Sequence, residues 1–224
     1  MHESQKKYVE NIQPYFNSKL DDDQRLLDTI NRFLEFHNFE KIKDKNKILD
    51  IGSGKGTFVE VCKKRGIIAH GIDGAKNNIN FEKDKLPFEN NSFDFISMIA
   101  VIEHIQNKEI LMNEIKRVSK NNSILIITTP NFKYCYKSFY NDPTHVSPFT
   151  EISLKKFLDN YGHKDINLGP YMVNKSAFFW RAKYSFFLAS MLPFTNHDFK
   201  GSKMIPSFLR GKSTSIISIS KIKK

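Results

Sequence analysis

The fold is decided by the stretch LDIGSGKGTF, which spans residues 49–58. An apolar run at residues 47–51 leads into its first glycine, Gly52, and a segment with helical spacing follows at residues 57–65. Glycines at alternate positions let the backbone turn sharply and approach a ligand closely. A strand, a glycine turn and a helix in this order predict the ligand-binding edge of an α/β sheet.

Strands and helices alternate outward from this turn. Helical spacing predicts helices at 108–118 and 150–161, and one or two amphipathic helices between residues 4 and 39. A weak pattern covers residues 77–81. Apolar runs predict further strands at 67–72, 92–99, 123–129, 166–173 and 213–222. Because strands that alternate with helices imply parallel crossovers, we expect an α/β, doubly wound, Rossmann-like fold.

The composition excludes several classes of protein. The chain has 224 residues, of which 40% are apolar, so it can bury a core and is not disordered as a whole. No apolar run reaches the roughly 18 to 20 residues that cross a bilayer. Residues 1–30 lack the apolar core of a signal peptide. We therefore expect a cytoplasmic protein in which Cys62 and Cys135 are reduced thiols.

The positive charge is concentrated in the C-terminal part of the chain. The net charge is +11. Residues 1–132 hold 20 Lys and Arg against 19 Asp and Glu, whereas residues 133–224 hold 15 against 5. Two explanations remain open. The excess reflects a lysine-rich source genome, or it faces an anionic partner such as a phosphorylated substrate, a nucleic acid or a membrane surface.

The residues around the glycine turn favour an amino-acid-bearing cofactor over NAD. A dinucleotide site needs its third glycine where this chain has Thr57. Asp50 would repel a pyrophosphate, but its carboxylate can accept hydrogen bonds from an ammonium group. Asp73, at the end of the second predicted strand, is placed to accept hydrogen bonds from both hydroxyls of a ribose.

With the glycine turn and both aspartates, the chain resembles the class I S-adenosylmethionine-dependent methyltransferases, in particular the broad type 11/12 group. The segments LPFENNSFDFI at 86–96 and AVIEHI at 100–105 match the family's entry to its fourth strand and the segment after that strand. The resemblance implies S-adenosylmethionine as cofactor and places Glu82 near the adenine amino group. The implied cofactor contacts are Asp50, Gly52, Ser53, Gly54, Gly56, Asp73, Gly74, Glu82 and Ala100.

The resemblance also implies an architecture. We expect a seven-stranded, mostly parallel sheet with an antiparallel last strand, in one domain that spans residues 1–224. N-terminal helices would occupy 1–45 and the cofactor-binding half 46–130. The substrate-side half would occupy 131–224, with a basic, aromatic insertion at 174–212.

Two histidines are candidate catalytic residues. His104 follows the predicted strand at 92–99, and His145 follows the one at 123–129, at the same edge of the sheet. A general base helps when the acceptor is a hydroxyl near neutral pH. The alternative for His104 is packing against the cofactor, and the alternative for His145 is a self-capped turn at 142–145.

Glu103, His104 and His145 also raise the question of a metal. In this pattern the chain looks like small-RNA 2′-O-methyltransferases and ubiquinone-pathway O-methyltransferases, where a Glu-His pair can help hold a divalent ion. The RNA enzymes have a second acidic residue where this chain has Ala100, and a paired histidine where it has Ile105. We therefore expect no metal.

The function implied is S-adenosylmethionine-dependent methyl transfer, to an oxygen of a small-molecule, quinone or glycan-type acceptor. An anionic acceptor would enter past Arg181, Lys183, Lys200 and Lys203. The aromatic stretch at 177–192 fits a core or dimer interface, or contact with a membrane surface or lipid-linked substrate. Two alternatives stay open: RNA methylation, which the basic C-terminal part supports, and a cofactor-binding partner subunit without activity of its own.

Overall fold

The computed structural model describes residues 20–171 and 214–224, which build a six-stranded sheet in the order β2-β1-β3-β4-β6-β5. The strands are β1 (Lys47–Ile51), β2 (Ile68–Ile72), β3 (Phe93–Ile99), β4 (Ser119–Pro130), β5 (Lys164–Pro170) and β6 (Ser215–Lys221). The α-helices are α2 (Leu20–Phe36), α3 (Thr57–Lys64), α4 (Glu109–Val118), α5 (Phe132–Cys135) and α6 (Glu151–Asn160). Short 3-10 helices are η2 (Ile102–His104) and η3 (Phe139–Asn141).

The first four strands run parallel to one another. β1 pairs in parallel with both β2 and β3, and β3 pairs in parallel with β4. β6 is antiparallel to both β4 and β5, which confirms the antiparallel last strand. In the sheet, β2 lies on one side of β1 and β3 lies on the other, so the order of the strands reverses at β1. The carboxyl end of β1 therefore lies at the switch point where doubly wound sheets bind their ligands.

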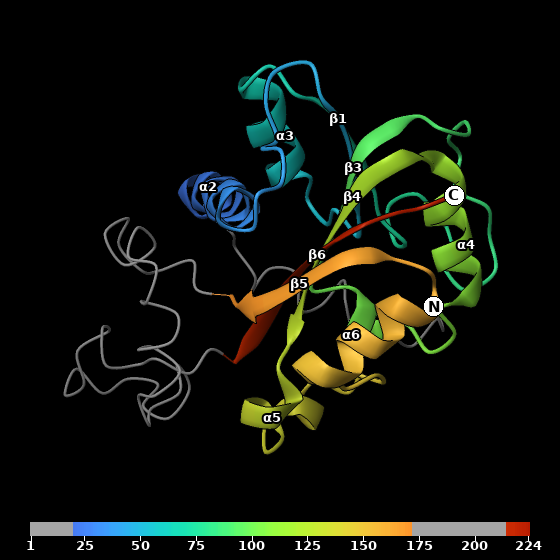
Figure 1. Ribbon diagram of the computed structural model, residues 1–224. Coiled ribbons are helices and arrows are strands. Elements are labelled where there is room, and N and C mark those ends of the chain that lie inside the picture. Colours follow the sequence, from blue (N-terminus) through green and yellow to red (C-terminus); the bar gives the residue numbers. More distant parts are fainter. Residues whose placement is uncertain (1–19, 172–213) are drawn as a thin grey trace.

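Helices cover both faces of the sheet (Figure 1). α2 and α3 pack on one face, in a core that includes Ile48 and Ile124. α4 and α6 pack on the opposite face, in a core that includes Leu49 and Leu125. Adjacent strand residues thus face opposite cores, as the period of two requires. Because both faces are covered, the central strands β1 and β3 are largely buried apolar runs, and this is why they could be found in the sequence.

Most predicted elements are confirmed within a few residues. The segment at 77–81, where the sequence showed only a weak pattern, forms no strand, and Asn78 there has a φ of 50°. Its asparagines offer no apolar side chain to bury on a sheet. Of the seven strands expected, the described residues supply six. Cys62 and Cys135 are free and buried, as expected.

Some expectations fall outside the described residues. Residues 1–19 and the insertion at 174–212 lie outside the described residues. The four basic residues expected to border the acceptor entrance belong to this insertion: Arg181, Lys183, Lys200 and Lys203. Within 20–171 and 214–224, no helix combines the length and the apolar character needed to cross a membrane.

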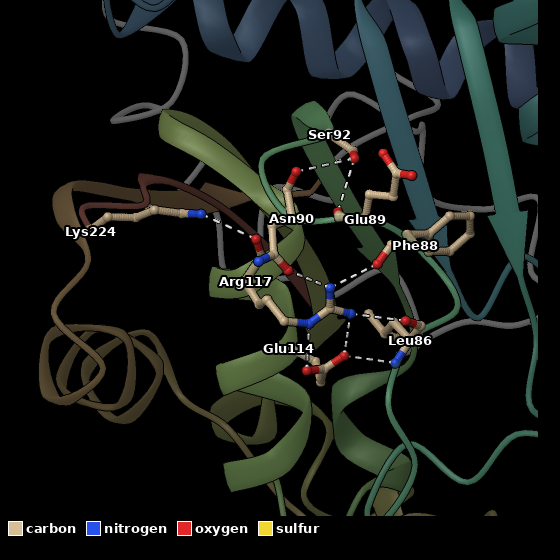
Figure 2. Close-up of polar contacts among 8 residues, drawn as sticks. All are labelled: Leu86, Phe88, Glu89, Asn90, Ser92, Glu114, Arg117 and Lys224. Carbon is tan, nitrogen blue, oxygen red and sulfur yellow. Dashed lines mark hydrogen bonds and ion pairs between the residues drawn. The ribbon is translucent and has the colours of Figure 1, made fainter.

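Arg117 fastens the segment before β3 to α4 (Figure 2). Its guanidinium donates to both carboxylate oxygens of Glu114, at 2.8 and 2.6 Å. It also donates to the carbonyl oxygens of Leu86 and Phe88, at 2.9 and 2.7 Å. Glu114 accepts from the Leu86 amide at 2.7 Å. Only 19% of the Arg117 side chain and 14% of the Glu114 side chain are exposed, so this forked pair is a shielded clamp on the entry to β3.

We predict that Arg117→Ala lowers the free energy of unfolding by about 2 to 3 kcal/mol, because it leaves a shielded carboxylate without its cationic partner and two carbonyls without their donor. Arg117→Lys should recover only part of this loss, since an ammonium cannot match the fork. Urea denaturation measures both.

The matched control is Arg65→Ala. Arg65 pairs with Asp28 at 2.6 Å, but the two side chains are 41% and 44% exposed. Its loss should cost at most about 1 kcal/mol. Equal losses of unfolding free energy in the two arginine-to-alanine variants would show that the Arg117–Glu114 pair stabilises the protein no more than an exposed ion pair does.

Candidate cofactor and catalytic site

The glycine turn lies at the carboxyl end of β1. Gly52 has a φ of 75°, and a Cβ atom there would lie 2.3 Å from Cγ2 of Val101. The amides of Gly52 and Ser53 donate to the carbonyl oxygen of Ile72, at 2.7 and 3.1 Å, and so tie the turn to the end of β2. Both the backbone angle and the close approach require glycine at position 52.

Gly54 and Gly56 face open space. Their φ angles are 51° and 82°, and a Cβ atom built on either would meet no other atom within 4 Å. Gly56 is the N-cap residue of α3. The turn is thus an open backbone cradle at the start of a helix, where α/β folds place their ligands.

Asp50 presents a buried carboxyl group beside this cradle. It is 4% exposed, and its Oδ1 accepts from the Ser97 hydroxyl of β3 at 2.7 Å. Burial raises the pKa of the Asp50 carboxyl to about 7; Ser97 opposes this rise, and the charges of Asp23 and Asp73 add to it. A buried carboxylate with negative neighbours is costly, so the position favours a cationic ligand.

Asp73 organises the loop after β2. Its Oδ2 accepts from the Gly54 amide at 3.0 Å, and its Oδ1 accepts from the amides of Ala75 and Lys76 at 3.0 and 3.3 Å. A carboxylate has about four acceptor sites, so the backbone uses three of them. Asp73 thus lies beside the glycine turn and keeps one acceptor site for a ligand. It also holds the glycine turn and the next turn together, which the sequence did not indicate.

The other expected contacts lie around the same edge. Glu82 Oε1 accepts from the Gln106 amide at 2.9 Å, which links the cofactor side to the segment that carries His104. The Ser53 hydroxyl approaches Gly71 closely, since a Cβ atom built on Gly71 would lie 2.8 Å from the hydroxyl oxygen. A Cβ atom on Gly74 would lie 3.3 Å from the Ile79 carbonyl oxygen.

Ala100 has a φ of 53° in the segment directly after β3, and its amide donates to the Thr128 carbonyl oxygen at 3.0 Å. A left-handed backbone at a residue other than glycine stores about 1 kcal/mol or more of strain. Strain of this kind is found where a backbone is held for function.

His104 is held by a chain of hydrogen bonds. The Thr144 hydroxyl lies 2.6 Å from Asp142 Oδ1 and 2.8 Å from His104 Nδ1. Because an ionised carboxylate only accepts, the hydroxyl proton goes to Asp142, and His104 Nδ1–H donates to the Thr144 oxygen. Burial, followed by the neighbouring His145, lowers the pKa of His104. The imidazole is therefore neutral near pH 7 and carries a lone pair at Nε2.

His145 lies beside it in the turn that the sequence predicted. Its Nδ1 donates to the Phe139 carbonyl oxygen at 2.7 Å, and the two imidazole rings are 4.8 Å apart. The Thr144 amide donates to Asp142 Oδ1 at 2.9 Å, so the turn is self-capped as well. The self-capped turn is therefore observed, and the catalytic role of His145 stays a prediction.

Glu103 completes the cluster. It is 1% exposed, its Oε2 accepts from the Thr129 hydroxyl at 3.0 Å, and burial raises the pKa of its carboxyl to about 7. One ligand atom from each of Glu103, His104 and His145 lies within 4.8 Å of the others. The cluster can exchange protons, and its donor set is also one that a divalent ion accepts.

Four contributing residues were missed in the sequence. Ser97 was included in a strand without a role of its own, although a lone polar residue in the run FISMI was a usable signal. Asp142 and Thr144 were interpreted only as turn residues, and Asp23 only as part of an acidic helix start. The contacts of Thr144 with His104 and of Ser97 with Asp50 join residues 40 or more positions apart, so no local pattern could identify these partners.

A family model described as a methyltransferase domain matches residues 16–168. Norajmaline N-methyltransferase of Rauvolfia serpentina is 29% identical over 156 residues, which are 61% of this chain and 52% of that enzyme. Ubiquinone biosynthesis O-methyltransferase of Bartonella tribocorum is 28% identical over 105 residues, 39% of this chain and 42% of that one. The aligned stretches thus cover about half of these curated relatives or less.

Among solved structures, a SAM-dependent methyltransferase from Archaeoglobus fulgidus superposes with a TM-score of 0.61 at 19% identity, covering 96% of this chain and 99% of that one. This likeness shows a shared fold. Since the family model spans more than half of the sequence, the expected class is confirmed: the chain belongs to the methyltransferase domain family, with the class I fold of the S-adenosylmethionine-dependent enzymes.

Proposed function

We propose that this protein transfers the methyl group of S-adenosylmethionine to a hydroxyl oxygen of a small-molecule, quinone or glycan-type acceptor. The observation that carries the choice of oxygen is the hydrogen-bond chain Asp142–Thr144–His104, which leaves the Nε2 lone pair of His104 available. A hydroxyl must lose its proton to become a good nucleophile, whereas a neutral amine attacks without a base.

The residues present fit the cofactor. Asp50, Asp73 and Glu82 offer only acceptors, which complement the ammonium, ribose hydroxyls and adenine amino group of S-adenosylmethionine. The space above Gly54 and Gly56 admits a ligand close to the backbone. When bound, this cofactor supplies an electrophilic methyl group on a positively charged sulfur.

The chain's own residues then handle the acceptor proton. His104 takes the proton from the acceptor hydroxyl at Nε2 and becomes an imidazolium. Thr144 continues to accept from Nδ1–H, and the charge of Asp142 stabilises the imidazolium through it. Burial raises the pKa of Asp142, but the hydrogen bonds from Thr144 and then the charges of His145 and His104 lower it overall, so Asp142 stays ionised. His145 adds a second nitrogen for proton exchange.

The surface next to His145 supports an aromatic or anionic acceptor. The Phe139 ring lies 4.6 Å from the His145 ring and 5.0 Å from the Tyr140 ring. Tyr136 and Tyr140 are 57% and 60% exposed. Lys137 lies over the Tyr136 ring at 5.8 Å. Exposed aromatic rings with a lysine offer stacking and charge to a planar or negatively charged molecule.

The relatives include both N- and O-methyltransferases, so they leave the acceptor atom open and the hydrogen-bond chain decides our choice. The direct test is to incubate the protein with isotopically labelled S-adenosylmethionine and matched pairs of hydroxyl and amine acceptors. Label in the hydroxyl partner of each pair supports the proposal. Label only in amines contradicts it, and label only in RNA, or none with any acceptor, favours the two alternatives named above.

We predict that His104→Gln lowers kcat by about 10²- to 10⁴-fold, the usual contribution of a general base, without a comparable change in S-adenosylhomocysteine affinity. The loss should shrink for an acidic phenol that is already ionised at the assay pH. Thr144→Val should show part of the defect and Thr144→Ser should restore activity. An equal loss for all acceptors would argue for packing instead of base catalysis.

Metal removal tests the same cluster. A nitrogen that binds an ion cannot take a proton, so the base role predicts that treatment with EDTA leaves kcat unchanged. Loss of activity on chelation, with recovery on adding Mg²⁺, Mn²⁺ or Zn²⁺, would reassign Glu103, His104 and His145 as ligands.

Cofactor binding should depend on pH through Asp50. Its raised pKa of about 7 means that the carboxyl is neutral below pH 7 and charged above it. Affinity for S-adenosylhomocysteine should therefore rise from pH 6 to pH 7.5, and fall again above about 8 as the ligand's own ammonium loses its proton. Calorimetry in buffers of different ionisation enthalpy should detect proton release on binding at pH 6.5. The low-pH arm should vanish in Asp50→Asn, and a flat wild-type profile would contradict the assignment.

A further inference from the structure

Asp23 of α2 is a buried carboxylate that the described structure leaves unsatisfied. It is 8% exposed, and its Oδ2 is buried with no hydrogen-bond partner. Buried polar atoms in folded proteins nearly always have a partner, and an isolated buried charge is especially costly. The atom therefore requires an explanation.

The position of Asp23 on α2 turns it inward. Helical spacing places it on the same face as Leu26, Leu27 and Ile30, which are at most 5% exposed and pack in the core shared with α3. Its charge raises the pKa of both Asp50 on β1 and Cys62 on α3, where burial is the main cause. The apolar residues beside Asp23 share their core with Ile48 of β1, and Asp50, two residues further along that strand, lies on the same face of the sheet.

We propose that Asp23 and Asp50 together bind the α-ammonium group of the cofactor, so that α2 supplies part of the cofactor site. This inference rests on the proposed function. An ammonium has three donors and one positive charge, which would satisfy the orphaned Oδ2 and offset the repulsion between two buried carboxylates.

The test compares two ligands and two variants. S-adenosylhomocysteine carries the ammonium, whereas 5′-methylthioadenosine shares the adenosine and sulfur but lacks the amino-acid end. Asp23→Asn keeps the size of the side chain and removes its charge. It should weaken S-adenosylhomocysteine binding by about 10- to 100-fold, as expected for a hydrogen bond to a charged group, and leave 5′-methylthioadenosine binding unchanged.

A stability measurement separates binding from a structural role. Removing an uncompensated buried charge should leave the melting temperature of the free protein equal or higher, while the shift induced by S-adenosylhomocysteine becomes smaller. The matched control is Asp28→Asn on the same helix, where the carboxylate pairs with Arg65 at the surface. It should change neither ligand's affinity. Asp23→Ser repeats the test if Asp23→Asn does not fold.

The outcomes are decisive. Unchanged S-adenosylhomocysteine affinity in a folded Asp23 variant, equal weakening of both ligands, or the same effect in Asp28→Asn each overturns the role of Asp23 and leaves the proposed function intact. If the wild-type protein binds neither S-adenosylhomocysteine nor S-adenosylmethionine, the proposed function falls and this inference falls with it.

Discussion

The burial of the Asp50 carboxyl at the end of β1 is the constraint on which the site depends. An ionised carboxylate in a desolvated position costs several kcal/mol unless a cation or several donors meet it. Ser97 supplies one donor from the next strand, and the described structure shows no cation beside Asp50. The fold thus places the Asp50 carboxyl as a preformed hydrogen-bond acceptor. A preformed carboxylate of this kind favours a positively charged ligand.

The two halves of the site have opposite electrostatic tasks. On the cofactor side, carboxylates are crowded together, which favours a cation. On the acceptor side, burial lowers the pKa of His104, while the Thr144 and Asp142 chain prepares it to receive a proton. In the function that we propose, environments that push neighbouring pKa values in different directions let one sheet edge both bind a charged donor and activate a neutral acceptor. Glu82 joins the halves through the Gln106 amide.

The site that we propose contains locally unfavourable features, and the surrounding scaffold compensates for them. Ala100 holds a left-handed backbone and Asp23 a buried unpaired oxygen. Away from the site, the strands are buried on both faces and Arg117 clamps the approach to β3 from outside the sheet. Strain and desolvation at a site persist only where the surrounding structure overdetermines them.

The amino-acid sequence by itself determined the alternation of strands and helices, because buried parallel strands are continuous apolar runs and the helices have one apolar face. It also identified the glycine turn, Asp50, Asp73 and the two histidines, because α/β folds place ligands where strands end. The contacts that these groups make are visible only in the tertiary structure. The protonation pattern of His104 follows from Thr144, 40 residues away, and Asp73 is committed to the Gly54 amide, 19 residues back. The orphaned oxygen of Asp23 exists because α2 packs its inner face beside α3. Hydrogen bonds and desolvation depend on distances in space, which a local sequence pattern does not encode.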